Sequence, residues 1–286
     1  MKKTIIIGAV MTAIGLFATL IGLASGASTD LVWQNGVKID KAYHSTNQLK
    51  QFKNLTLNTN NYDVTVQTGT RFQVEITGSK LSKPVITQDG DNLTISNKDF
   101  DPVNIGFGRV SPKLIITVPT DTQLETIKGN LATSDLTINT LQVKQAQLEL
   151  DNGSLDAHNL TISDSGRLAL NNGDAEIKNS NLSNVSLKMK NGATEFDNNT
   201  LTNGSYESSN GSQEFDDVTF KSVVNVKNRN GKIEMDSPIT DGYQLSSANG
   251  KIQLFDRQTS HQLNENETAA NRIVANTRNG KIEIDD

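Results

Sequence analysis

The sequence contains no cysteine, which excludes disulfide bonds, a thiolate nucleophile and cysteine-based zinc or iron–sulfur sites. Aromatic residues make up only 5% of the chain and there are only 5 prolines, so the core has to be built from Leu, Ile and Val. This composition favours many short, regular strands. Basic residues are also in deficit, with 27 Lys and Arg against 32 Asp and Glu. The formal charge of −5 argues against nucleic acid as a partner.

Charge is also missing from the segment Thr4–Thr29, which follows two lysines and has an apolar centre, Ile5–Leu23. In a helix this centre would extend roughly 28 Å, close to the thickness of a bilayer core. We predict that residues 1–29 form a signal-anchor, a single transmembrane helix with its amino terminus in the cytoplasm and the rest of the chain outside. The alternative is a secreted protein released by cleavage near Ala27, because Ser25-Gly26-Ala27 suits a signal peptidase.

Small residues recur on one face of this predicted helix, among them Gly8, Gly15, Gly22 and Gly26. Such a stripe would allow weak self-association of two helices in a membrane. The alternative is that these glycines have no partner, because glycine is common in membrane helices. Residues 30–51 follow as a polar juxtamembrane stalk.

The most informative excess in the composition is asparagine, with 32 residues and nine Asn-Gly dipeptides. Seven of these dipeptides recur at spacings of 20, 19, 19, 20, 19 and 30 residues, at Gly153, Gly173, Gly192, Gly211, Gly231, Gly250 and Gly280. Apolar residues stand five before and four after nearly every one of these glycines, and around each turn the hydrophobic period is two. The pattern predicts strand, tight turn, strand, because Asn and Gly tolerate a positive φ.

A local pattern of this kind also fits an antiparallel meander of hairpins. The strict period favours a solenoid, since identical residues recur at identical places in Asn230–Glu234, Asn249–Gln253 and Asn279–Glu283. In a parallel solenoid each turn asparagine would bond to that of the next coil in a ladder. We therefore predict an all-β fold, a single-stranded right-handed parallel β-helix with coils of about 19–20 residues, over residues 52–286.

Irregular parts accompany the repeat. Asn61–Val66 fits a first coil, with Tyr62 at the glycine position, whereas residues 99–112 and 255–272 fit no period and are expected to be protruding loops. A short helix is expected near Glu265–Asn271. The chain stops after Lys281–Asp286, so we expect an open edge guarded by the charges of that strand.

Several segments of the sequence resemble a known family. Asn54–Val66, Leu114–Pro119 and the serial strands ending in Asn-Gly-Lys-Ile-Glu-Ile resemble the bacterial β-strand-repeat "putative adhesin" domain of unknown function. The chain is also similar to LiaG-type membrane-anchored envelope proteins, which are associated with cell-envelope stress operons. The resemblance covers roughly Phe52 to Asp286 and implies a β-solenoid at the cell envelope. It brings no catalytic residues with it.

Candidate catalytic groups are few. Four carboxylates could supply acid–base chemistry on a glycan, at Asp151, Asp156, Asp164 and Asp174, although turn formation and a charged solvent face explain them equally well. The three histidines, His44, His158 and His261, are far apart and lack metal-ligand spacing, so exposed positions are expected.

Cation and phosphate sites are not indicated either. Asp89–Asn92 has the outline of a calcium loop but not the EF-hand ladder, and a turn is the better interpretation. Phosphate-loop and Gly-x-Ser-x-Gly patterns are absent from the sequence. We expect no catalytic, cofactor or metal site.

The sequence therefore predicts a non-catalytic cell-envelope protein that displays an extracytoplasmic β-solenoid for adhesion, scaffolding or ligand binding. Its predicted partners are the cell membrane, through the helix, and an envelope polymer or protein. A sensory or accessory role in an envelope-stress response is the alternative. A glycan-active enzyme on a β-helix is the third possibility, and the missing aromatic platform argues against it.

Overall fold

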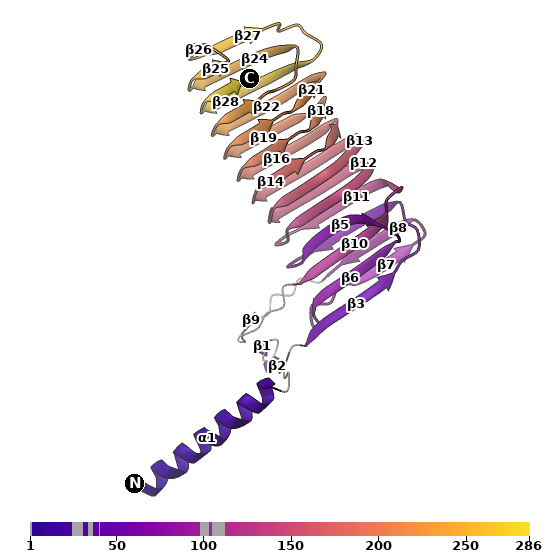
Figure 1. Cartoon of the computed structure of the whole chain (residues 1–286), viewed down its shortest axis with the longest axis vertical. Helices are drawn as coiled ribbons and strands as arrows, with labels where there is room; N and C mark the ends of the chain where they lie inside the picture. The colour runs from indigo at the N-terminus through magenta and orange to yellow at the C-terminus, as the bar shows by residue number, and fades with distance from the viewer. Residues whose placement is uncertain (1, 25–30, 34–36, 40, 98–102, 105–111) are drawn as a thin grey trace.

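The computed structural model describes residues 2–24, 31–33, 37–39, 41–97, 103–104 and 112–286. Side chains are described within residues 5–21, 41–97 and 112–286. These parts of the chain contain one helix and 29 strands, most of them stacked into a long solenoid (Figure 1). A separate antiparallel sheet is formed by β2 (Val37–Ile39), β1 (Leu31–Trp33) and β9 (Val103–Asn104).

Each regular coil has three sides. The first side, here called the long face, carries strands up to eight residues long in the regular coils. In spatial order it contains β7 (Val85–Asp89), β8 (Asn92–Ser96), β4 (Asn54–Thr59), β11 (Gln123–Leu131), the last parts of β12 (Leu136–Asn152) and β13 (Leu155–Asn172), β16 (Val185–Asn191), β19 (Ser205–Asn210), β22 (Val223–Asn230), β28 (Arg272–Asn279), β24 (Gly242–Asn249) and β27 (Gln262–Glu265).

The second face follows the Asn-Gly corner. It contains β3 (Ala42–Gln48), β6 (Gln73–Ser79), β10 (Lys113–Pro119), β5 (Asp63–Gly69), the first parts of β12 and β13, β14 (Ala175–Lys178), β17 (Thr194–Asp197), β20 (Gln213–Asp216), β23 (Ile233–Asp236), β29 (Ile282–Asp285), β25 (Ile252–Leu254) and β26 (Arg257–Thr259). A short third face contains the middles of β12 and β13, then β15 (Asn181–Ser183), β18 (Thr200–Thr202) and β21 (Thr219–Lys221).

Parallel pairing in register between coils confirms the predicted solenoid. Ile177 lies beside Phe196, and Phe196 beside Phe215, so the residues four after each glycine form one column. The rings of Phe196 and Phe215 stack at 4.9 Å with an interplanar angle of 1°, and both residues are fully buried. The period-two pattern therefore marks the inward positions of each coil, as predicted. The handedness stays a prediction.

The corners explain the repeat. Gly173, Gly192, Gly211 and Gly231 have φ between 138° and 149°, a region that L-residues with a side chain rarely adopt. Space is equally restrictive, because a Cβ on Gly211 would lie 1.8 Å from the carbonyl oxygen of Gly192. The other two corners are turned by residues in the left-handed region, such as Asn198 (φ 52°) and Asn203 (φ 50°), which Asn tolerates better than most residues.

The predicted asparagine ladder is present. In the regular stack each Nδ2 donates to the Oδ1 of the neighbouring coil's asparagine at 2.8–3.0 Å. The ladder runs in spatial order through Asn152, Asn172, Asn191, Asn210, Asn230, Asn279 and Asn249. Asn279 therefore lies between Asn230 and Asn249, and the spatial order of the coils departs from the order of the sequence.

This departure overturns the predicted open edge at the chain end. β28 pairs with β22 on one side and β24 on the other, and β29 lies in the same way between β23 and β25 (Figure 1). The last coil of the chain is therefore an interior coil of the stack. Glu283 and Asp285 therefore lie on a strand that is paired on both sides, and Lys281 lies next to it. Their charges do not guard an end of the stack.

Both ends of the stack are closed by antiparallel strands. β27 pairs with β24 and β26 with β25, so residues 255–272 cap the solenoid; the loop and short helix expected there are wrong. At the other end β7 pairs with β8, and β6 with β10. The first coil, β4–β5, also lies inside the stack, between β8 or β10 on one side and β11 or β12 on the other.

The amino-terminal expectations have mixed outcomes. A helix is present, α1 (Lys2–Ala24), and it includes Gly8, Gly15 and Gly22. In the part of the chain that the structure describes, no helix combines the length and the apolar character needed to cross a membrane, so the predicted transmembrane helix is not supported. Gly26, the cleavage position at Ala27 and most of residues 99–112 lie outside the described residues. β3, within the expected stalk, pairs with β6, and the sheet thus begins before Phe52.

We expect Gly211→Ala to lower the free energy of unfolding by about 2–5 kcal/mol, because left-handed strain adds to a clash with the next coil. Urea denaturation followed by circular dichroism measures this loss. Gly90→Ala is the matched control, since Gly90 also has a positive φ but nothing within 4 Å of its added Cβ. An equal loss in both variants would contradict the packing argument.

Hydrogen exchange should detect the interior position of the last coil. Amides of β28 and β29 should exchange as slowly as those of β19 and β20, because both pairs are bonded on two sides. The edge strands β26 and β27 should exchange faster. Mass spectrometry of peptides covering 272–285 tests this, and rapid exchange of alternate amides there would restore the open-edge arrangement.

Candidate functional site

The four candidate carboxylates occupy structural positions and do not converge. Asp151 accepts a bond from Asn171 Nδ2 at 2.5 Å, and Asp174 caps a turn by accepting from the backbone N–H of Ala193 at 2.8 Å. Asp156 lies on the second face with its Oδ1 2.9 Å from His158 Nε2. Asp164 sits near the corner between the third and long faces. Turn and surface roles account for all four.

The histidines are separated, as predicted. His44 lies on β3, with Nδ1 3.0 Å from Thr77 Oγ1, and His261 lies between the capping strands β26 and β27. His158 is on β13, beside Asp156. Among the described residues, no three His, Asp or Glu side chains are placed to hold a metal ion together.

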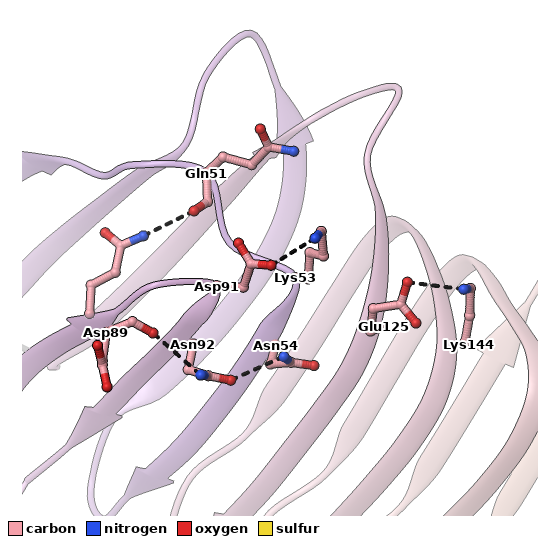
Figure 2. Close-up of polar contacts among 9 residues, drawn as sticks. Gln51, Lys53, Asn54, Asp89, Asp91, Asn92, Glu125 and Lys144 are labelled. Atoms are coloured by element: carbon pink, nitrogen blue, oxygen red, sulfur yellow. Dashed lines mark hydrogen bonds and ion pairs between the residues drawn. The ribbon is translucent and has the colours of Figure 1, made fainter.

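The Asp89–Asn92 segment is the turn between β7 and β8, with Gly90 in the left-handed region. Figure 2 shows that Asp91 points toward Lys53, with Oδ2 2.7 Å from Nζ, and that Asn54 donates to Asn92 Oδ1 at 3.0 Å. These contacts join the antiparallel cap to the first coil. The carboxylate of Asp91 is thus paired with a lysine, and the turn interpretation is confirmed.

Aromatic side chains offer no exposed sugar platform in the described part of the solenoid. The large rings of Tyr62, Phe196, Tyr206 and Phe215 are fully buried. Burial raises the pKa of the Tyr206 phenol far above its usual range, since its hydroxyl lies in the core without a hydrogen-bond partner among the described residues.

Carboxylates and lysines form rows on the second face because the coils are in register. Glu176, Glu195, Glu214, Glu234 and Glu283 stand at equivalent positions of successive coils. Lys178 reaches Glu176 at 2.6 Å and Glu195 at 3.2 Å, and the hydrogen bonds raise the pKa of the lysine. Hydrogen bonds from Lys281 and Lys232 lower the pKa of Glu283.

Asp216 is the exception on this face. Its Oδ1 is buried without a hydrogen-bond partner, and Glu214, Asp236 and Asp197 lie nearby. Burial, reinforced by these negative neighbours, raises the pKa of Asp216 to about 6. The carboxylate is therefore a local source of instability at neutral pH.

The long face carries the candidate binding surface, here called the long-face groove. It has a volume of about 660 Å³ and crosses the strands from β16 to β24, with outward side chains of Lys188, Glu207 and Lys227 on one side. Glu207 lies 3.8 Å from Lys188 Nζ and 3.4 Å from Lys227 Nζ. Short side chains, Ser209 and Ala248, contribute to the lining and leave space between the longer ones.

The Toastrack DUF4097 family matches residues 52–285. The chain belongs to that family. No curated protein matches the chain. The Toastrack match thus covers the stacked coils and most of both caps.

Two solved structures are similar to this chain at low sequence identity. A "putative adhesin" from Bacteroides fragilis is 14% identical, with a TM-score of 0.53 over 85% of this chain and 97% of that chain. A "putative adhesin" from Parabacteroides distasonis is 13% identical, with a TM-score of 0.46 over 85% of this chain and 97% of that one. At these identities the Bacteroides structure supports the fold alone.

Sequence reasoning missed the long-face groove. A signal was present, because the hexapeptide Arg-Asn-Gly-Lys-Ile-Glu occurs at both 229–234 and 278–283. The arginine precedes the turn asparagine in both, at an outward position of the long face. The adjacency of the two copies depends on the coil order, which the repeat does not reveal.

Asp216→Asn should stabilise the protein at pH 7.5 and have no effect at pH 4. The pKa of about 6 in the folded state exceeds the value of about 3.9 expected when unfolded, so the folded state binds the proton more tightly. The destabilisation of the folded state by the Asp216 carboxylate consequently grows as the pH rises from about 4 to about 6. The gain should be about 1 kcal/mol or less, because water screens the half-exposed side chain. Denaturation midpoints across this pH range measure it, with the exposed Asp256→Asn as control; identical pH profiles for Asp216→Asn and the parent would contradict it.

Proposed function

We propose that this chain is a non-catalytic cell-envelope protein whose solenoid presents a rigid outer surface to an extracytoplasmic ligand. The observation that carries the proposal is the register of the coils, which holds charged side chains in fixed rows on a filled core. Such rows suit a long, repetitive ligand better than a small substrate. Membership of the Toastrack DUF4097 family and the adhesin-like description of structural neighbours support this reading.

Adhesion and scaffolding are the functions that this arrangement serves. A solenoid gains contact area with each added coil while every coil stays supported by its two neighbours. The long-face groove is a place where the described surface is both hollowed and charged. The candidate carboxylates Asp151, Asp156, Asp164 and Asp174 take part in turns and surface pairs, which supports binding over hydrolysis.

The full-length protein should sediment with isolated bacterial cell walls without releasing new reducing ends. The expected result follows from a binding surface that lacks an acid–base pair. The double variant Asp156→Asn/Asp164→Asn should sediment as the parent does. Release of reducing ends by the parent but not by this variant would identify a glycan-active enzyme, and failure to sediment would remove the wall as the ligand.

A further inference from the structure

Two arginines stand side by side on adjacent strands of the long-face groove because of the unusual coil order. Arg229 lies on β22 and Arg278 on β28, and the flanking pairs Asn228–Thr277 and Asn230–Asn279 are in register. The two side chains therefore project outward from adjacent strands, about 4.8 Å apart at the backbone. In a stack that followed the sequence, β22 would lie beside β24, and Arg229 would have Ala248 as its neighbour.

Neither arginine is neutralised by the protein. Both side chains are exposed, and neither forms an ion pair with any side chain that the structure describes. Like charges directly across neighbouring strands destabilise a sheet. The other cations of the groove, Lys188 and Lys227, share the single carboxylate of Glu207. The lining thus contains four cations and one anion, although the chain as a whole has a net charge of −5.

The second face shows that the fold can neutralise such rows. Lys232 follows Arg229 across the Asn-Gly corner and pairs with Glu283 at 2.9 Å. Lys178 pairs with two glutamates. On the long face the positions that could supply such carboxylates are filled by Asn276, Ser246 and Ser209. The long-face groove therefore keeps an excess of positive charge that its own side chains do not neutralise, and within a Debye length of about 8 Å this excess dominates the local field.

We propose that the long-face groove binds a linear polyanion, whose acidic groups are held by Arg229 and Arg278 while its chain runs along the solenoid axis; this rests on the proposed ligand-binding function. Guanidinium groups bind phosphate and carboxylate oxygens through two parallel hydrogen bonds. The groove crosses five coils, about 19 Å, which fits several repeat units of an extended polymer. Phosphodiester polymers and uronic-acid polysaccharides share this chemistry.

Nucleic acid is the less suitable polyanion. Single-stranded nucleic acids bind through base stacking on exposed aromatic rings in addition to charge. The groove lining contains no aromatic residue among those described. An envelope polymer with charged groups on a saturated backbone needs no such platform.

The test measures binding of the full-length protein to poly(glycerol phosphate) and to polygalacturonate, with neutral dextran as a blank. Arg229→Gln/Arg278→Gln should weaken binding at least about tenfold and make the dependence of log Kd on log salt shallower by about two. Lys113→Gln/Lys221→Gln removes the same charge from exposed positions elsewhere and should change Kd by less than about twofold. Tighter binding of one polymer identifies phosphate or carboxylate as the preferred group.

A stability measurement separates a binding role from a structural one. The double arginine variant should unfold at the same urea concentration as the parent or a higher one, because repulsion between stacked cations is removed. Lower stability, equal losses in both double variants, or binding of oligothymidylate as tightly as the preferred polymer would each overturn the proposal. Normal sedimentation of the arginine variant with cell walls would overturn the assignment of the groove as the binding site but leave the proposed function intact.

Discussion

The close contact between stacked glycine corners is the constraint on which the solenoid depends. Along the ladder of coils, a Cβ on any corner glycine would approach the carbonyl oxygen below it to between 1.8 and 2.2 Å. Only glycine permits the backbones to stack at sheet spacing there, and the preceding asparagine then lies directly above its equivalent and bonds to it. This contact fixes the register of all three faces, because a slip of one residue would place a side chain in the corner.

Fixed register also determines the chemistry of the outer surface. Each outward position repeats in a straight row about 4.8 Å per coil, so charges cannot be arranged independently. On the second face the row of glutamates is relieved by Lys178 and Lys232, each of which reaches two carboxylates. At Asp216, by contrast, burial and negative neighbours raise the pKa of the carboxyl to about 6. Paired and unpaired rows therefore distinguish surfaces that the fold has neutralised from those that a ligand could neutralise.

The coil, its corners and its core columns could be predicted from sequence because each is encoded locally by Asn-Gly and by alternating apolar residues. The order of the last coils could not, because Asn249–Gln253 and Asn279–Glu283 are nearly identical, and each has an isoleucine at the same inward position to pack beside Ile233 of β23. Among the seven Asn-Gly corners, the interval of 30 residues before Gly280 was the one clear departure from the period. Its extra residues form β26 and β27, which turn back along β24 and β25, a non-local pairing that no periodic pattern specifies.

Insertion of the last coil solves a problem that a sequential solenoid leaves open. A terminal parallel coil exposes unpaired backbone groups, whereas here antiparallel strands cover β24 and β25 and the remaining chain returns to the other side of them. At the amino-terminal end β4–β5 is likewise enclosed, with β8 and β10 on one side and β11 and β12 on the other. The last coil of the chain is thus held between two neighbours, whereas β3, at the other end of the described stack, is an edge strand beside β6. The same insertion places Arg278 against Arg229, and closure of the stack and the charge of the long-face groove consequently arise from one topological feature.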